Sequence, residues 1–207
     1  MQIRYPLFTI RYSASGVVVY CDFLFITPNC MQQTNLYTIT IPVMAKALGA
    51  LDKMLDKVTA AAEAKKSDWH PAAKFEEALL NDKLIFDQFP LVRQVQIACD
   101  NLKGSAARLS ETEAPKFPDD EKTVAELKTR IAKTLEYVQT IKPEQIIGKE
   151  DTLIALPFSQ GTVSGFDYAT QYVLPNFFFH FTTSYAIMRK NGIDLGKSDF
   201  IDGLPLK

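Results

Sequence analysis

Apolar residues recur at three- and four-residue steps in four separate segments of this chain, and this spacing constrains the fold more than any other feature. The four segments cover about residues 40–66, 90–109, 123–142 and 167–191. Such spacing places the apolar side chains of each segment on one face of a helix. Four amphipathic helices can cover one another's apolar faces around a common core. The sequence therefore predicts an all-α fold, an antiparallel up-and-down four-helix bundle.

Residues at the ends of these segments indicate where the helices begin. Thr40 is expected to cap the first helix, with Pro42 in a first turn that needs no amide donor. Thr123 and the residue three positions later, Glu126, form a capping-box pair at the start of the third helix. The fourth helix is expected to be capped by Asp167 and interrupted near Pro175.

The connections between the helices carry their own signals. Residues 67–89 predict a short helix followed by an irregular crossing over one end of the bundle. Residues 152–156 and 162–166 are β-prone and are separated by Pro, Ser and Gly, which predicts a small β-hairpin before the last helix. The tail from Asp194 has no strong period and is expected to pack as an extended strap.

The N-terminal residues differ from the rest of the chain. Residues 1–30 contain aromatic and β-branched clusters without helical spacing, so they predict strands or no regular structure. Asp22 interrupts the apolar stretch Val17–Ile26, which disfavours both a secretory signal and a membrane-spanning helix. We therefore predict that residues 1–35 are an extension outside the domain and that residues 36–207 form the helical domain.

Composition restricts the partners and the compartment. The chain has 207 residues, which is long enough for a hydrophobic core, and its 23 basic and 24 acidic residues leave a net charge of −1. It has no basic stripe for a phosphate backbone, so neither nucleic acid nor a membrane is an expected partner. Three cysteines do not form a disulfide framework, which favours a reducing, cytoplasmic location.

Polar residues at helical spacing predict a pocket between the second and fourth helices. On the mainly aromatic fourth helix, Asn176 and His180 lie on one strip with Thr183 or Ser184. On the second helix, one face carries Arg93, Gln96, Asp100 and Lys103. We predict ligand binding by Arg93, Gln96, Asp100, Asn176 and His180, with Arg93 as the anchor for an anionic group. In the alternative interpretation, His180 is only a hydrogen-bonded core residue and the helix-two strip is solvated.

Known catalytic and metal-binding motifs are absent from the sequence. The other histidine, His70, lies in a Trp-His-Pro turn where an exposed loop residue is usual. Two histidines without a Cys pair do not supply a zinc site, and there is no phosphate-binding glycine loop or serine elbow. No cofactor, metal ligand or catalytic residue is predicted from the residues.

Two stretches resemble a known family: residues 89–100 (FPLVRQVQIACD) and residues 174–187 (LPNFFFHFTTSYAI). They are similar to an uncharacterised domain-of-unknown-function family in the DinB/YfiT-like superfamily of metalloenzymes, over about residues 38–200. The resemblance implies an up-and-down four-helix bundle, often dimeric. It also implies a divalent metal held by three histidines, one from the second helix and two from the fourth at i and i+4. Here His180 matches one ligand, but Ser184 stands at the i+4 position and residues 93–103 contain no histidine.

Three hypotheses about function follow. The first is a DinB-like protein that binds a small, anionic ligand in the polar pocket, with or without catalysis. The second is a divalent-metal-dependent transferase or isomerase of the DinB type. The third is a non-catalytic dimerisation module that acts as a homodimer.

Overall fold

The computed structural model describes residues 5–13, 16–24, 34–156 and 160–204, the first two ranges by their backbone alone. Contacts divide the chain into two units, Met1–Thr34 and Asn35–Lys207. The first unit contains strands β1 (Tyr5–Ser13) and β2 (Gly16–Leu24), which pair antiparallel with Tyr5 opposite Leu24. The second unit is mainly helical, as predicted.

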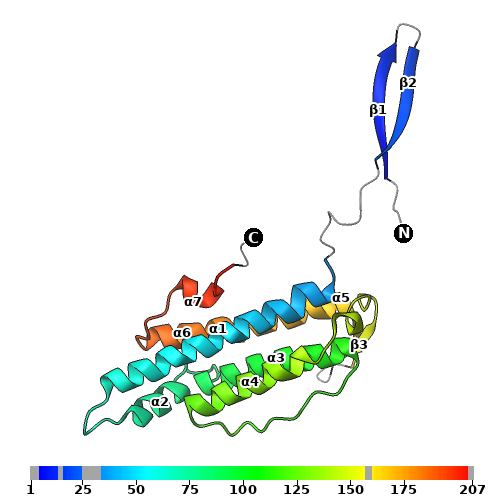
Figure 1. Ribbon diagram of the computed structural model, residues 1–207. Coiled ribbons are helices and arrows are strands. Elements are labelled where there is room, and N and C mark those ends of the chain that lie inside the picture. Colours follow the sequence, from blue (N-terminus) through cyan, green and yellow to red (C-terminus); the bar gives the residue numbers. More distant parts are fainter. Residues whose placement is uncertain (1–4, 14–15, 25–33, 157–159, 205–207) are drawn as a thin grey trace. The chain divides into compact units, whose positions relative to one another are not determined.

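Four long helical segments make up most of the second unit (Figure 1). They are α1 (Leu36–Lys65), α3 (Leu91–Ser110), α4 (Val124–Gln139) and α6 (Leu174–Lys190). Helices α1 and α3 each pack on both α4 and α6, so the four enclose one core. The predicted apolar faces are buried in it, including Leu48, Leu102 and Phe181, each 0 % exposed. No helix in the described part of the chain has the length and apolar character needed to cross a bilayer.

Helix α1 begins five residues earlier than predicted. Its cap is Asn35, whose Oδ1 accepts from Thr38 N while Thr38 Oγ1 accepts from Asn35 N, both at 3.0 Å. The prediction that Thr40 caps this helix is wrong, because Thr40 is buried inside it and donates its hydroxyl to Leu36 O. Pro42 is consequently inside the helix and not in its first turn.

The last long helix also starts before its predicted cap. Ser164 Oγ accepts from Asp167 N at 3.0 Å, so Ser164 is the cap and Asp167 lies in the first turn. Segments α5 (Gly165–Asp167) and η3 (Tyr168–Val173) lead directly into α6 without a break. In place of the interruption predicted near Pro175, η3 is a π-helix in which Leu174 N–H donates to the carbonyl of Ala169, five residues back. This wide turn accommodates a proline that has no N–H of its own.

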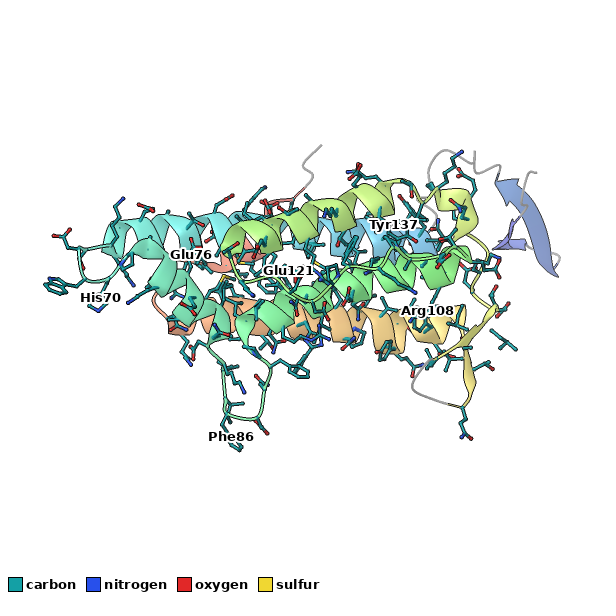
Figure 2. The ribbon with its side chains drawn as sticks, turned by 90° about the horizontal axis from the view of Figure 1, so that it is seen from below. His70, Glu76, Phe86, Arg108, Glu121 and Tyr137 are labelled. Carbon is teal, nitrogen blue, oxygen red and sulfur yellow. The ribbon has the colours of Figure 1, made fainter. Side chains whose placement is uncertain are left out.

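The connections before the tail contain the predicted short helix and the predicted hairpin, but the loop after the short helix projects from the bundle. Helix α2 (Ala72–Asn81) is followed by the irregular residues 82–90, and Figure 2 shows Phe86 at the tip of this loop, away from the helices. Strands β3 (Leu153–Ala155) and β4 (Thr162–Ser164) form the predicted antiparallel hairpin, after the 3-10 turn η2 (Pro143–Gln145).

The C-terminal tail is not the extended strap predicted from Asp194. It forms helix α7 (Lys197–Ile201) on the surface of α1. Lys57 pairs with Asp199 at 2.8 Å and Lys53 with Asp202 at 2.7 Å. The ring of Phe200 lies 4.4 Å, centroid to centroid, from that of Phe181. The aromatic contact with the core and the two ion pairs explain why a segment without a long apolar period still folds here.

Candidate functional site

A buried arginine on α4, Arg130, organises the polar side chains of the α3–α4 face. Its side chain is 1 % exposed, and its guanidinium contacts three carboxylates from different parts of the chain. Nη2 lies 2.8 Å from Asp100 and 2.9 Å from Asp119, and Nη1 lies 2.9 Å from Glu121. Nη1 also donates to Pro118 O at 2.9 Å. Burial opposes the charge of Arg130, but Glu121 and Asp100 hold its pKa above the ordinary value.

This network fixes the segment between α3 and α4, residues 111–123, which we call the crossover. Figure 2 shows Glu121 on the crossover, where it passes along α3 and α4. The Lys103 ammonium lies 4.2 Å from the ring centroid of Phe117 and 3.1 Å from Asp100. A cation over an aromatic ring and the ion pairs of a buried guanidinium hold a segment that has no regular structure of its own.

Three of the five predicted ligand-binding residues belong to this network. Arg93 bonds to Asp119 and, at 3.2 Å, to Gln96 Oε1, and Gln96 Nε2 donates to Glu121 at 2.8 Å. Asp100 receives Arg130, as described above. Arg93, Gln96 and Asp100 therefore contact the crossover and α4, and Arg93 also lies close enough to His180 to lower the pKa of its ring.

Sequence reasoning missed Arg130 itself. The residue falls on the apolar face of α4 next to Leu127, Ile131 and Thr134, all buried. A charged residue on a buried face requires partners, because an unpaired buried charge is very costly. That position was the signal in the sequence that could have identified it.

The predicted histidine, His180 on α6, is buried and bonded to a different residue of α3. Gln94 Nε2 donates to Phe89 O at 3.0 Å, so its Oε1 faces His180 and accepts from Nδ1–H at 2.7 Å. Gln94 is 1 % exposed and His180 8 %. Both polar groups are thus satisfied inside the core, as the structural interpretation of His180 expected.

The pH dependence of stability should report this buried ring. Burial, and to a lesser degree Arg93, lowers the pKa of His180. The unfolded state therefore binds more protons than the folded state below about pH 6.5. Above that pH the neutral ring makes its full contribution to the free energy of unfolding. This contribution decreases as the pH falls towards the pKa of His180 in the folded state. We expect the Tm to fall on acidification in this range, and less so in His180→Gln.

The matched control is the exposed histidine, His70. The variant His70→Gln makes the same substitution outside the core, and all three proteins are melted between about pH 7.5 and about pH 5.5. Equal dependence in His180→Gln and the unmodified protein would mean that His180 does not titrate differently in the folded state.

The residues around His180 do not form the histidine triad implied by the family resemblance. Ser184, four residues on, is buried and donates its hydroxyl to His180 O at 2.9 Å. The α3 residue that contacts His180 is Gln94, whose amide oxygen is a poor substitute for an imidazole ligand. Among residues 35–156 and 160–204, no group of three His, Cys, Asp or Glu side chains is placed to hold a metal ion. The donor set therefore does not fit a divalent metal at this position.

A cavity of about 190 Å³ lies beside the π-helix, and we call it the η3 cavity. Two predicted ligand-binding residues, Asp100 and Asn176, line it together. Its wall comes from α3, η3, α6 and the residue that follows β3, and consists of Ile97, Asp100, Asn101, Arg108, Leu156, Tyr168, Tyr172 and Asn176. π-Helical turns are frequent at functional sites, and four elements converge on this one.

Two features of α3 distinguish the η3 cavity. The side-chain oxygen Oδ1 of Asn101 is buried and accepts no hydrogen bond from any residue that the structure describes. Arg108, which Figure 2 places at the η3 end of the helices, donates from Nη1 to the Tyr168 hydroxyl at 3.2 Å. Both residues lie on one stripe of α3 with Ile97 and Gly104, at seven-residue and three- or four-residue spacing.

A larger cavity of about 410 Å³ lies between the crossover and α4. Its wall includes Arg130 and Glu121, which already pair with each other, and Glu126, which caps α4. The Nε of Arg130 is buried without a partner among the described atoms, but its guanidinium already faces three carboxylates. Asn101 Oδ1, in contrast, belongs to a neutral amide.

The remaining candidate for reactivity, Cys99, is buried on α3, as expected from its place on the apolar face. Burial raises the pKa of its thiol to about 12. Because the thiolate is the reactive form, this cysteine is a small core residue and not a nucleophile.

Comparisons with known proteins identify the family. A family model described as a domain of unknown function (DUF1993) matches residues 36–201. The crystal structure of a DinB family member protein from Shewanella denitrificans aligns with a TM-score of 0.75 and 39% sequence identity, over 83% of this chain and 94% of that one. A comparison with curated proteins found no match. The chain belongs to the DUF1993 family of uncharacterised DinB-like proteins.

Proposed function

We propose that this DinB-like protein binds a small polar molecule in the η3 cavity and does so without a metal at the DinB position. In this proposal α1, α3, α4 and α6 act as an up-and-down bundle whose polar pocket lies between α3 and the last helix. Asp100 and Asn176 keep the ligand-binding role that the sequence predicts for them. Asn101, Arg108 and Tyr168 join them in place of Arg93, Gln96 and His180.

The polar wall of the η3 cavity is the observation that carries this proposal. Asp100 and Arg108 supply opposite charges, and Asn101, Tyr168 and Asn176 supply neutral polar groups. These residues come from α3, η3 and α6, so three elements place polar side chains around one space. A small number of polar groups that converge on a pocket is typical of small-molecule sites.

The volume of the cavity restricts the ligand. Water occupies about 30 Å³ per molecule in the liquid, so about 190 Å³ holds roughly six waters. The α3 wall contributes both charges, Asp100 and Arg108. A compact polar metabolite fits this space better than a cofactor does.

The two alternative functions have less support. A metal-dependent transferase or isomerase needs a ligand set, and Gln94 and Ser184 supply a neutral amide and a hydroxyl that is already bonded to a backbone carbonyl. A dimerisation module needs an exposed apolar surface, and the loop after α2 offers one, with Ile85 52 % and Phe86 84 % exposed. Self-association through this loop is compatible with ligand binding, and the mass in solution over a range of concentrations measures it.

The proposal is tested with the variant Asn101→Leu. Leu matches Asn in the number and branching of its side-chain heavy atoms and has no polar atom, so it removes the polar group of Asn101 from the wall. We expect the apo variant to melt at a higher temperature than the unmodified protein, because the desolvation cost of the buried Oδ1 disappears. We also expect it to lose the Tm increase that a panel of small polar metabolites produces in the unmodified protein.

Asn81→Leu serves as the matched control, since Asn81 is an exposed residue at the end of α2 and remote in sequence from the cavity wall. It should keep the ligand response. If no compound of the panel shifts the Tm of the unmodified protein, or if Asn101→Leu responds as fully as the unmodified protein, the η3 cavity is not the binding site.

A further inference from the structure

The two charged residues in the wall of the η3 cavity differ in how their charges are balanced. The Asp100 carboxylate contacts two cations, because its Oδ1 lies 2.8 Å from Arg130 Nη2 and 3.1 Å from Lys103 Nζ. Arg108 forms no ion pair with any residue that the structure describes, and its hydrogen-bond partner there is the Tyr168 hydroxyl. The wall therefore has a positive charge without a direct partner among the described side chains.

Tyr168 does not supply the missing negative charge. The residue is 2 % exposed, and burial raises the pKa of its phenol even though the neighbouring Arg108 opposes this shift. The phenol consequently keeps its proton at neutral pH. Its oxygen accepts from Arg108 Nη1 at 3.2 Å. A neutral group thus orients the guanidinium and leaves its charge unbalanced.

Gly104 provides the space in which this guanidinium lies. A methyl group at residue 104 would be 2.9 Å from Arg108 Nη1 and 3.8 Å from its Cζ. The side chain of Arg108 is therefore folded back along α3, as long side chains on helices tend to be. Arg108 is also exposed to solvent, in contrast with Asn101 Oδ1, which is buried. An arginine side chain has five N–H donors, so several remain for a ligand after the one to Tyr168.

The wall also offers apolar and aromatic surface. Ile97 of α3 and Leu156 after β3 contribute aliphatic side chains. The rings of Tyr168 and Tyr172 are stacked, with 6.0 Å between their centroids and 19° between their planes. Such a wall gives no advantage to a bare inorganic anion, but it removes the hydrocarbon part of an organic anion from water.

Arg93, the anchor predicted from the sequence for an anionic group, has different partners. It bonds to Asp119 of the crossover and to Gln96, and it is not among the residues of the η3 cavity wall. Arg108 is the arginine that does line this cavity. The predicted anionic character of the ligand can therefore be kept, with a different arginine as its anchor.

We infer that the ligand of the η3 cavity is a small organic anion whose single carboxylate pairs with Arg108 while its hydrocarbon part lies against Ile97, Leu156 and Tyr172. This inference rests on the proposed function and narrows it to one class of ligand. The planar guanidinium matches a carboxylate through two parallel N–H···O bonds. A space of about 190 Å³, enough for roughly six waters, suits a short-chain acid.

The test is an NMR titration of the full, ¹⁵N-labelled chain with acetate, propionate and butyrate, each compared with its uncharged amide. We expect at least one acid to produce saturable shifts of the Gly104 amide and the Arg108 side-chain N–H signals. Its affinity should be at least about tenfold above that of its amide, because charge-assisted hydrogen bonds are the stronger ones. Sodium chloride at the same ionic strength should not produce these shifts.

Two results of this titration would overturn the inference. Equal affinity of every acid and its amide would show that the negative charge is not recognised. Equal shifts with chloride would show that the site takes an adventitious ion only.

Two variants locate the carboxylate at Arg108. Arg108→Gln removes the charge, whereas Gly104→Ala keeps it and displaces the guanidinium by the added methyl group. Both should weaken binding of the acid by roughly tenfold or more. Because Gly104→Ala places alanine inside a helix, it should melt no lower than the unmodified protein, so a loss of binding would not reflect unfolding.

Lys133→Gln is the matched control, since it makes the same change of charge in the wall of the larger cavity. It should leave the affinity for the acid unchanged. A loss of binding in Lys133→Gln but not in Arg108→Gln would place the anion in the larger cavity and contradict the inference.

The outcomes separate the two proposals. If other polar compounds bind in a manner that depends on Asn101 and the acids do not bind, the inference about the ligand class is wrong and the proposed function stands. If neither the acids nor any compound of the wider panel binds, both are wrong.

Discussion

Replacing Arg130 by Met is expected to lower the free energy of unfolding by about 3–5 kcal/mol, because it removes a buried guanidinium and leaves the largely buried Glu121 carboxylate without its charged partner. Glu121 is 10 % exposed at its side chain and would keep its charge without the guanidinium that now contacts it. Asp100 and Asp119 would lose their contacts with Nη2. Met fills much of the volume of the Arg stem, so the loss measures the charge and its hydrogen bonds. Urea denaturation at neutral pH gives this value.

The matched control lies two residues away on the same helix. Lys128 also contacts two carboxylates, Asp52 at 2.8 Å and Asp56 at 2.7 Å, but its side chain is 28 % exposed. Exposed pairs of this kind contribute about 0–1 kcal/mol, so Lys128→Met should have a small effect. Two variants with similar, small losses would show that water reaches Arg130 and that the network does not depend on burial.

The same network explains what the sequence could and could not predict about the site. The residues Arg93, Gln96 and Asp100 share one face of a helix, and in the structure all three do contact one polar cluster. Their spacing, however, does not tell which neighbour that face meets. A rotation of α3 by one residue, about 100°, exchanges the stripe of Asp100 for that of Gln94 and Asn101. The structure directs the first stripe to the crossover and α4, with Asp100 also in the wall of the η3 cavity, and the second stripe to α6 and η3.

Local signals with a fixed geometry were predicted well. The pair Thr123 and Glu126 forms the predicted capping box, with Glu126 N donating to Thr123 Oγ1 at 3.2 Å. The β3–β4 hairpin also appears where Pro, Ser and Gly separate two β-prone stretches. The caps of α1 and of the last helix were missed because Asn35 and Ser164 lie ahead of the apolar repeat, while Thr40 and Asp167 lie at its edge. A cap is determined by its bond to the residue three positions on, and both Asn35 with Thr38 and Ser164 with Asp167 make that bond.

The tail and the mainly aromatic helix show where tertiary contacts outweigh local pattern. Residues 197–201 are too few to form a stable helix alone, and they fold because Phe200 and two ion pairs attach them to the rest of the unit. The π-helix η3 could not be predicted either, since Pro175 is equally compatible with a break, a kink or a wide turn.

Gly165→Ala is expected to be the second strongly destabilising substitution, with a loss of about 3 kcal/mol or more. Its added methyl group would lie 2.1 Å from the carbonyl oxygen of Lys149, far inside van der Waals contact. This neighbour is backbone and cannot rotate away. The next residues hold the junction in place, since Phe166 N donates to Glu150 O at 2.9 Å. Leu36 N donates to Glu150 Oε1 at 3.4 Å.

Gly104→Ala is the control, because it adds the same methyl group to the other crowded helical glycine. At residue 104 the nearest atom is the tip of a flexible side chain, Arg108 Nη1, and the site is inside α3. The tip can move at little cost, and Ala exceeds Gly in helix propensity by about 1 kcal/mol, so this variant should be as stable as the unmodified protein or more stable. The comparison of midpoints in urea therefore distinguishes the two glycines. Gly165 has the backbone of Lys149 as its close neighbour, whereas Gly104 has the movable guanidinium of Arg108. Equal losses at both positions would contradict the packing at Gly165 and, with it, the way the last helix joins the start of α1.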